Sequence, residues 1–140
     1  IADCGVEIVA VDATDRVNAF GKSAWEIIPE IKQKYPLIQV MADISTFDEA
    51  RHAVELGADI VATTLSGHTS YTRHLSGGCN FDLVREISGE LGCFVICEGK
   101  IWSREDAKRA FDCGAGAIVV GTAITNPMLI TKRIVDYCKE

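Results

Sequence analysis

The stretch around Glu98 combines residue types that could move a proton beside a bound anion. Glu98, Gly99 and Lys100 follow the apolar run Phe94–Ile96, which is short enough to be a buried strand. A carboxylate can accept and return a proton, and a glycine lets an anion approach the backbone closely. Ser103 then offers a cap for a following helix. The alternative is a capped strand end with a solvated lysine, because carboxylates at strand tips are common.

Polar side chains also follow other short apolar runs. The carboxylates Asp12 and Asp43 each end such a run, and Thr64 and Ser66 follow a third. Because the carboxyl ends of strands in a parallel barrel converge on one mouth, we expect these side chains to meet Glu98 there and to bind a substrate. We also expect the carboxylates to be buried and to have partners, although either aspartate could instead be a cap or turn residue.

Two glycines end the last two predicted strands and could hold a phosphate group. Backbone N–H groups at Gly99 and Gly121, beside a short helix, are the usual phosphate cradle of parallel barrels. Lys100 and Thr122 are their neighbours in the same loops. A tight turn also requires glycine, so each glycine could serve the backbone alone.

The histidines do not indicate a metal centre. His52, His68 and His74 share no ligand spacing, and we predict neither a metal site nor a cofactor. We expect His52 to be exposed on a helix. His68 is expected in a mobile loop, where it could touch a substrate.

Strands and helices must alternate to position these residues. Apolar runs predict strands near 6–12, 38–43, 59–64, 94–98 and 117–121. Helices are predicted over 23–34, 47–56, 80–91, 104–113 and 127–139. Thr46 and Ser103 begin capping-box patterns, and Pro127 suits the first turn of the last helix. Apolar spacing predicts inward-facing side chains on the last two helices at Ala107, Ala110, Phe111, Ile130, Ile134 and Tyr137.

A short pattern occurs three times along the chain. Gly5, Gly57 and Gly114 each follow a predicted helix end and precede a β-branched run, so each glycine should supply a left-handed helix cap. Strict alternation of strand and helix predicts a parallel sheet with right-handed crossovers.

Two architectures fit this alternation, an open doubly wound sheet and a (β/α) barrel. We find neither a dinucleotide-binding glycine motif nor a P-loop lysine in the sequence, and we favour the barrel. A complete (β/α)8 barrel has eight strands in about 250 residues. We therefore predict an α/β fold, a (β/α)8 TIM barrel of which residues 1–140 form about five C-terminal units in one domain. Three N-terminal units are expected to be missing.

Composition argues against several classes of partner. The 140 residues carry a net charge of −6 and contain no basic run, so nucleic acid is not expected to bind. No apolar stretch approaches the roughly 20 residues of a membrane span. We expect the cysteines to be small buried thiols of a reducing cytoplasm rather than disulfides or zinc ligands. They are Cys4, Cys79, Cys93, Cys97, Cys113 and Cys138.

Several runs resemble one enzyme family. The runs 41–47 and 63–67, in this order, are similar to the N-acetylmannosamine-6-phosphate 2-epimerases, as are 10–14, 97–101, 121–125 and 130–133. The resemblance extends over essentially all of the chain. It implies a (β/α)8 barrel enzyme of bacterial sialic-acid catabolism. Such an enzyme interconverts the 6-phosphates of N-acetylmannosamine and N-acetylglucosamine without a redox cofactor.

The resemblance also implies roles for individual residues. Glu98 matches the catalytic glutamate of the family, and Asp43 matches an aspartate that binds substrate. Gly99, Gly121 and Thr122 match the loops on the phosphate side.

Two departures from the family pattern concern the base and the phosphate. The catalytic lysine of the family lies on an early strand, before this sequence begins, and is not Lys100. Asn126 stands where many members carry an arginine that helps to hold phosphate. Lys100 also replaces an arginine of many members, which keeps the charge but loses the bidentate fork.

The chemistry of the implied reaction suits these residues. In an open-chain sugar, C2 lies next to the aldehyde, so its proton can leave to form an enediolate-type intermediate. Epimerisation requires removal of that proton from one face and its return to the other, with the oxyanion stabilised. Glu98 could take one of these roles.

Two other functions are compatible with the sequence. One is another phosphate-binding barrel enzyme. The other is an inactive fragment that keeps phosphate binding or an assembly surface, and a homodimer through open strand edges would fit that case. A polypeptide limited to residues 1–140 is expected to be inactive.

Overall fold

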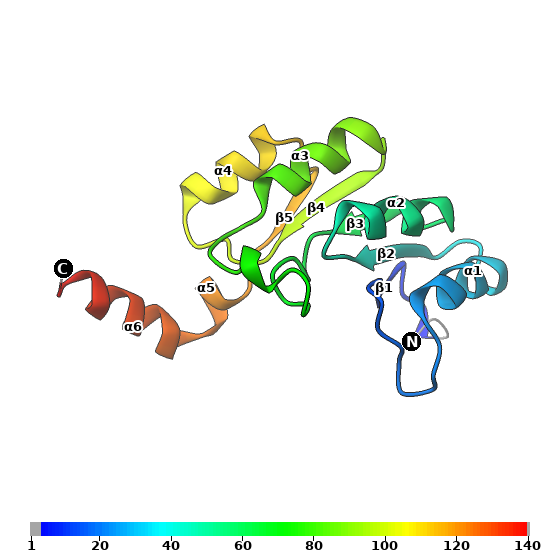
Figure 1. The fold of residues 1–140 in the computed structure, drawn as a ribbon, viewed down its shortest axis with the longest axis horizontal. Coiled ribbons are helices and arrows are strands. Elements are labelled where there is room, and N and C mark those ends of the chain that lie inside the picture. The colour runs from blue at the N-terminus through cyan, green and yellow to red at the C-terminus, as the bar shows by residue number, and fades with distance from the viewer. Residues whose placement is uncertain (1–3, 140) are drawn as a thin grey trace.

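The computed structural model describes residues 4–139, which form one five-stranded parallel sheet (Figure 1). Its strands are β1 (Ile8–Asp12), β2 (Gln39–Asp43), β3 (Ile60–Ala62), β4 (Phe94–Glu98) and β5 (Ala117–Val119). The strands lie side by side in chain order, and each neighbouring pair is parallel. The predicted parallel sheet is therefore confirmed, although β3 and β5 end earlier than the predicted strands 59–64 and 117–121.

The helices connect these strands and lie near their predicted positions. They are α1 (Ala24–Lys34), α2 (Phe47–Glu55), the short 3-10 helix η2 (Arg73–Leu75), α3 (Phe81–Glu90), α4 (Arg104–Asp112), α5 (Thr122–Thr125) and α6 (Pro127–Tyr137). Thr46 and Ser103 form the predicted capping boxes at the starts of α2 and α4. Pro127 begins α6 as predicted, and the Asn126 side chain caps that helix by accepting a hydrogen bond from Leu129 N–H.

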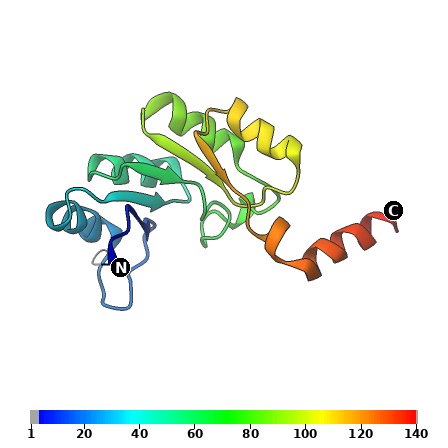
Figure 2. The same ribbon diagram turned by 180° about the vertical axis from the view of Figure 1, so that it is seen from behind.

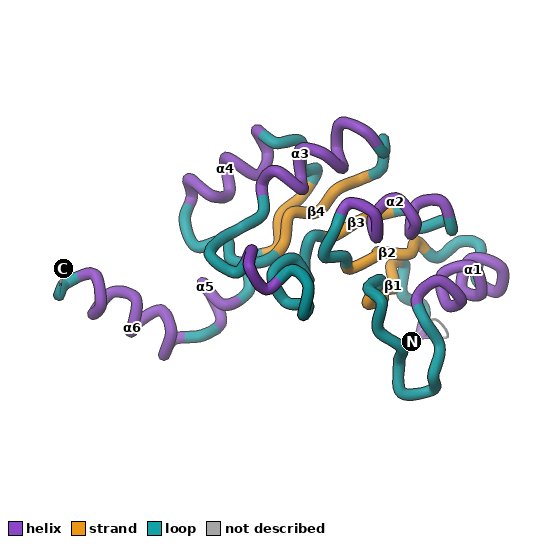
Figure 3. Tube along the Cα trace, in the orientation of Figure 1, coloured by secondary structure: helices purple, strands orange, loops and turns teal. Residues whose placement is uncertain are grey.

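Helices α1 to α4 pack against one another in sequence and cover the same side of the sheet (Figure 1; coloured by element in Figure 3). Between helices and sheet lies an apolar core that includes the fully buried side chains of Ile28, Val40, Val61 and Ile87. This arrangement places every strand–helix connection at one end of the sheet. That end carries the carboxyl termini of all five strands.

Gly57 and Gly114 end their helices as predicted, whereas the helix end expected before Gly5 includes residues 1–3, which lie outside the described residues. Gly57 and Gly114 have φ angles of +101° and +97°, in the left-handed region that L side chains rarely adopt. At Gly114 a Cβ atom would also lie 2.2 Å from the Ser88 hydroxyl oxygen. These turns return the chain to the sheet directly after each helix.

The sheet is open in the part of the chain that the structure describes. β1 pairs only with β2 and β5 only with β4 among residues 4–139, so two parallel edges remain (seen from behind in Figure 2). The predicted free edge at the first strand is present among the described residues. In the same range, no helix is both long and apolar enough to cross a membrane.

The last helix differs from the prediction. α6 extends away from the sheet and packs mainly on α5 (Figure 1), which leaves Ile134 62% and Tyr137 80% exposed. Their prediction as inward-facing residues was wrong, because helical spacing predicts an apolar face without saying what covers it. Phe111, at 50% exposure, was also wrongly predicted to face inward, whereas Ala110 is buried.

The cysteines are only partly the buried residues that we predicted. Cys97 and Cys113 are buried, whereas Cys4 and Cys138 are exposed because they lie outside the packed strand–helix units. All six thiols are free.

Candidate active site

The predicted site residues meet at the carboxyl end of the sheet. A cavity of about 440 Å³ lies there, and six of them line it: Thr64, Glu98, Gly99, Lys100, Gly121 and Thr122. His68 lines the same cavity, as predicted for a residue that could reach a substrate. A larger hollow of about 720 Å³ lies beside α6 and contains none of these residues, so the smaller cavity is the candidate for chemistry.

Asp43 stands at the tip of β2, behind the wall of the cavity. Its carboxylate accepts a 2.7 Å hydrogen bond from the hydroxyl of Thr64. Burial raises the pKa of Asp43 above its ordinary range; the Thr64 hydrogen bond opposes this shift, and the nearby charge of Asp12 adds to it. The site therefore favours a proton on Asp43 more than water does.

Glu98 lies at the tip of β4 and shares this environment. Burial raises the pKa of the Glu98 carboxyl, and the negative charge of Asp43 raises it further. A side-chain hydrogen bond with Thr64 acts in the opposite direction. Thr64 thus stands beside both carboxyl groups, and the charge of Asp43 disfavours ionisation of Glu98.

Thr63 holds the backbone of Glu98, a role that our sequence analysis missed. Its hydroxyl oxygen accepts a hydrogen bond from Glu98 N–H at 3.1 Å and donates to the Glu98 carbonyl at 3.0 Å. The doubled threonine at a strand tip was visible in the sequence. No local pattern, however, pairs residues that are 35 positions apart.

Lys100 and Ser66, two of the predicted site residues, contact each other directly. The Lys100 amine donates a 3.0 Å hydrogen bond to the Ser66 carbonyl, and the Ser66 hydroxyl accepts a hydrogen bond from Asn80. Ser66 is buried at 6% exposure. Gly67 makes this contact possible, since a Cβ atom there would lie 2.5 Å from the Lys100 amine nitrogen. Ser66 therefore supports the lysine from behind the cavity.

The loop after β5 also lines the cavity, next to the tip of β4. Gly121 precedes the single turn of α5, which Thr122 begins. Both residues are exposed, so their polar groups are open to a ligand. At the tip of β4, Gly99 has a φ of +99°, and Lys100 is the one non-glycine residue with positive φ, at +62°, within residues 4–139.

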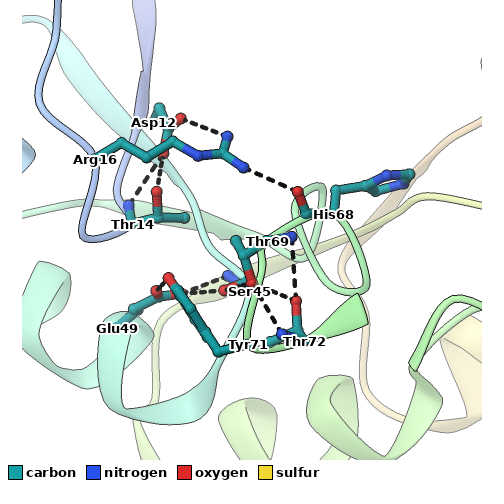
Figure 4. A network of polar contacts seen from close by, with 9 residues as sticks. All are labelled: Asp12, Thr14, Arg16, Ser45, Glu49, His68, Thr69, Tyr71 and Thr72. Atoms are coloured by element: carbon teal, nitrogen blue, oxygen red, sulfur yellow. Dashed lines mark hydrogen bonds and ion pairs between the residues drawn. The ribbon is translucent and has the colours of Figure 1, made fainter. Parts of the chain in front are cut away.

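Asp12 was predicted to be buried, but its side chain is exposed. Its side chain is 42% exposed because β1 is an edge strand, and the Arg16 guanidinium lies 3.2 Å from its carboxylate. Arg16 also donates a 2.9 Å hydrogen bond to the His68 carbonyl (Figure 4). The tip of β1 is thereby tied to the loop that carries His68.

A buried carboxylate anchors the rest of that loop. Glu49, at 7% exposure, accepts 2.7 Å hydrogen bonds from both the backbone and the hydroxyl of Ser45. It also accepts from Thr46 N–H and from the Tyr71 hydroxyl (Figure 4). This network ties Tyr71 of the loop over the site to the start of α2, and the mobility of the loop stays a prediction.

Two thiols meet directly behind Glu98. The Cys79 and Cys97 sulfur atoms are 3.1 Å apart, and Cys97 immediately precedes Glu98 on β4. Hydrogen bonding with Cys79 and burial together raise the pKa of the Cys97 thiol far above its ordinary range. Cys97 therefore remains a neutral thiol at physiological pH.

This arrangement can exchange a proton with a small anionic ligand. Glu98, whose pKa is raised, lines the cavity together with the glycine loops, and Asp43, whose pKa is also raised, stands behind its wall. His52 is exposed on α2 as predicted and stacks on Trp25 at 4.3 Å. In the described range, no three His, Cys, Asp or Glu side chains are grouped so that they could hold a metal ion.

Comparisons with known proteins agree with the sequence resemblance. The family described as "NanE: Putative N-acetylmannosamine-6-phosphate epimerase" matches residues 1–140. A protein of Caldanaerobacter subterraneus subsp. tengcongensis named "Putative N-acetylmannosamine-6-phosphate 2-epimerase" is 44% identical over the whole chain, which covers 59% of that protein. A protein of the same name from Clostridioides difficile is 46% identical over 94% of the chain and 57% of its own length.

A solved structure shows the same fold. The N-acetylmannosamine-6-phosphate 2-epimerase from Clostridium perfringens superposes with a TM-score of 0.87 at 41% identity. The match covers 97% of this chain and 58% of that one. The chain therefore spans about three-fifths of the length of these relatives.

Proposed function

Because the chain belongs to the NanE family of N-acetylmannosamine-6-phosphate epimerases, we propose that the protein containing this sequence is a carbohydrate epimerase. It interconverts N-acetylmannosamine 6-phosphate and N-acetylglucosamine 6-phosphate, which differ only in configuration at C2. The reaction belongs to amino-sugar and sialic-acid catabolism. The observation that carries the proposal is the cavity that Glu98 lines together with the Gly121-Thr122 loop.

Glu98 is the catalytic residue of this site. In the open-chain sugar the C2–H bond breaks, its electron pair forms the C1–C2 double bond of an enolate whose negative charge lies on the C1 oxygen, and the proton goes to a base. A proton then returns to C2 from the opposite face. A carboxyl whose pKa is raised towards neutrality can act in either direction, which suits a reversible reaction.

The family resemblance implies that the second proton-transfer group is a lysine, and no residue of this sequence matches it. Glu98 therefore transfers the proton on one face of C2, and that lysine transfers it on the other face. Lys100 cannot replace it, since its amine is bound to the Ser66 carbonyl.

Asp43 and Thr64 bind the sugar next to Glu98. Their hydrogen bond leaves one oxygen of the carboxylate and one lone pair of the hydroxyl for substrate hydroxyl or amide groups. Asp12 and Ser66 act less directly, Asp12 through Arg16 at the rim and Ser66 through Lys100.

The phosphate lies between the two glycine loops. Gly99 and Gly121 offer backbone N–H groups, Thr122 offers a hydroxyl, and Lys100 contributes positive charge. Asn126 caps α6 rather than reaching the cavity, so the loops must hold the phosphate without the arginine of many family members.

The proposal includes the setting of the enzyme. It needs no cofactor, because the acidity of C2 comes from the sugar carbonyl. A cytoplasmic location is consistent with six free thiols, and a net charge of −6 offers no surface for nucleic acid. A homodimer is compatible with the exposed apolar side chains of α6.

Proton exchange at C2 provides the test. The protein encoded by the complete gene is incubated in deuterated water with N-acetylmannosamine 6-phosphate and followed by NMR. We expect formation of N-acetylglucosamine 6-phosphate with deuterium at C2. Turnover without deuterium at C2 would exclude this mechanism, and failure to convert either sugar phosphate would exclude the function.

A further inference from the structure

We propose that Thr63 is a positioning residue, which fixes the peptide of Glu98 and thereby aims its carboxyl group into the cavity. This proposal rests on the proposed function for its catalytic consequence. Its structural part stands on the two hydrogen bonds between Thr63 and the Glu98 backbone.

The need for such a residue arises where the sheet ends. β3 stops at Ala62, which pairs with Ile96, whereas β4 continues for two more residues to Glu98. Thr63 N–H still donates to the Ile96 carbonyl at 3.2 Å. Beyond that bond, the Thr63 hydroxyl occupies the place of a strand backbone and forms hydrogen bonds with the N–H and C=O groups of Glu98.

At the other edge of β4, Glu98 is in register with Val119 of β5, but no strand or helix follows Glu98 directly along the chain. Gly99 and Lys100 follow it with φ angles of +99° and +62°, so the chain turns sharply away from the strand. A rotation of the Glu98 peptide at this turn would swing its side chain. The Thr63 hydroxyl resists this rotation because one oxygen is bound to both the N–H and the C=O group.

Burial makes Thr63 a support rather than a substrate contact. Its side chain is 1% exposed, and its hydroxyl hydrogen is already used by the Glu98 carbonyl. The neighbouring Thr64 instead donates its hydroxyl to Asp43. Two consecutive threonines therefore hold the two acidic residues. Thr63 binds the backbone of Glu98, and Thr64 binds the side chain of Asp43.

The kinetic test compares isosteric and hydroxyl-retaining variants of the full-length protein. Thr63→Val keeps the side-chain shape but removes both hydrogen bonds, and Thr63→Ser keeps the hydroxyl. We expect Thr63→Val to lower kcat at least about tenfold with KM within about twofold, since a small misplacement of a catalytic group slows the chemical step. Thr63→Ser should recover most of kcat.

Asp59→Asn is the matched control, because Asp59 precedes the same strand at the end remote from the cavity. This variant loses the ion pair in which the Lys32 Nζ atom lies 2.8 Å from the Asp59 Oδ2 atom. It therefore tests whether a general loss of stability lowers kcat. Its kcat and KM should stay close to those of the wild type. Equal losses of kcat in Asp59→Asn and Thr63→Val, or no loss in Thr63→Val, would overturn the positioning role.

Amide hydrogen exchange tests the contact without any activity. In the wild type, which needs no substitution to fold, Glu98 N–H should exchange at least about 100-fold more slowly than a free amide. Thr63→Val should remove this protection and Thr63→Ser should keep it. Exchange of the wild-type Glu98 amide at the free rate would overturn the proposal. If the wild type turns over neither sugar phosphate but this amide is protected, the proposed function fails and the contact stands.

Discussion

The Thr64 hydroxyl donates a 2.7 Å hydrogen bond to the Asp43 carboxylate and so joins the tips of β3 and β2. The two residues are 21 positions apart in the chain. Thr64 also interacts with Glu98, which means that one neutral hydroxyl stands between two carboxyl groups. A hydroxyl has one hydrogen to donate, so it cannot donate to both at once. Ionisation of both carboxyl groups is therefore poorly compensated.

Asp43→Asn should make the protein more stable at neutral pH. Burial raises the pKa of Asp43, so the folded state binds this proton more tightly than the unfolded state does. The contribution of the protonated Asp43 carboxyl to the stability of the fold is fully present at low pH. It is lost as the pH rises through the pKa of Asp43 in the folded state. Asparagine keeps an acceptor for Thr64 and carries no charge. Urea unfolding should show a higher midpoint for Asp43→Asn at pH 7, and the difference should shrink as the pH is lowered.

The same substitution should weaken catalysis, because Asp43 is proposed to bind the sugar. A variant that is both more stable and less active would show that this carboxylate is kept for function. A lower unfolding midpoint at pH 7 would mean that the charge of Asp43 stabilises the fold.

Glu98→Gln should lower kcat of the full-length protein by at least about 100-fold while KM changes little. The amide keeps the size of the side chain but cannot accept and return a proton. Steady-state kinetics with N-acetylmannosamine 6-phosphate measures the change, and binding of the substrate by calorimetry confirms that the cavity is intact. Turnover near that of the wild type would leave Glu98 a structural strand end.

Glu49→Ala should destabilise the protein by about 2–4 kcal/mol. The buried Glu49 carboxylate accepts hydrogen bonds from Ser45, Thr46 and Tyr71, and its loss leaves those donors unpaired. Asp48→Ala, on the preceding residue, is the control, since that side chain is 82% exposed and its ion pair with Arg51 is solvated. Its effect should be within about 0.5 kcal/mol. Equal shifts of the thermal midpoint in the two variants would argue against the network.

A polypeptide limited to residues 1–140 should associate with itself and lack epimerase activity. β1 and β5 each offer an unpaired parallel edge, and α6 exposes Met128, Ile134 and Tyr137 to solvent. The second proton-transfer group is also expected outside this range. Analytical ultracentrifugation and a coupled activity assay test both points. A soluble, active monomer would contradict the expected strand count and the assigned base.

The positions of strands and helices could be predicted because their signals are local. Thr46 and Ser103 cap helices through hydrogen bonds to residues only three positions further along the chain. Gly57 ends a helix because its own backbone is left-handed. The choice of a barrel rested on the strict alternation of these elements and on the family resemblance. The extent of β3 was less predictable, since Thr63 and Thr64 favour a strand locally but turn to contacts beyond the sheet.

The sequence by itself determined that carboxylates, threonines and glycines stand at strand tips, because parallel strands place their carboxyl ends together wherever helices return the chain. Only the tertiary structure decided which of them touch. It pairs Thr63 with the Glu98 backbone and Lys100 with Ser66, contacts between positions 35 and 34 apart that no periodicity encodes. It also left Asp12 on an exposed edge and Ile134 in solvent, because burial depends on what packs against an element. An apolar or acidic pattern describes only the element itself.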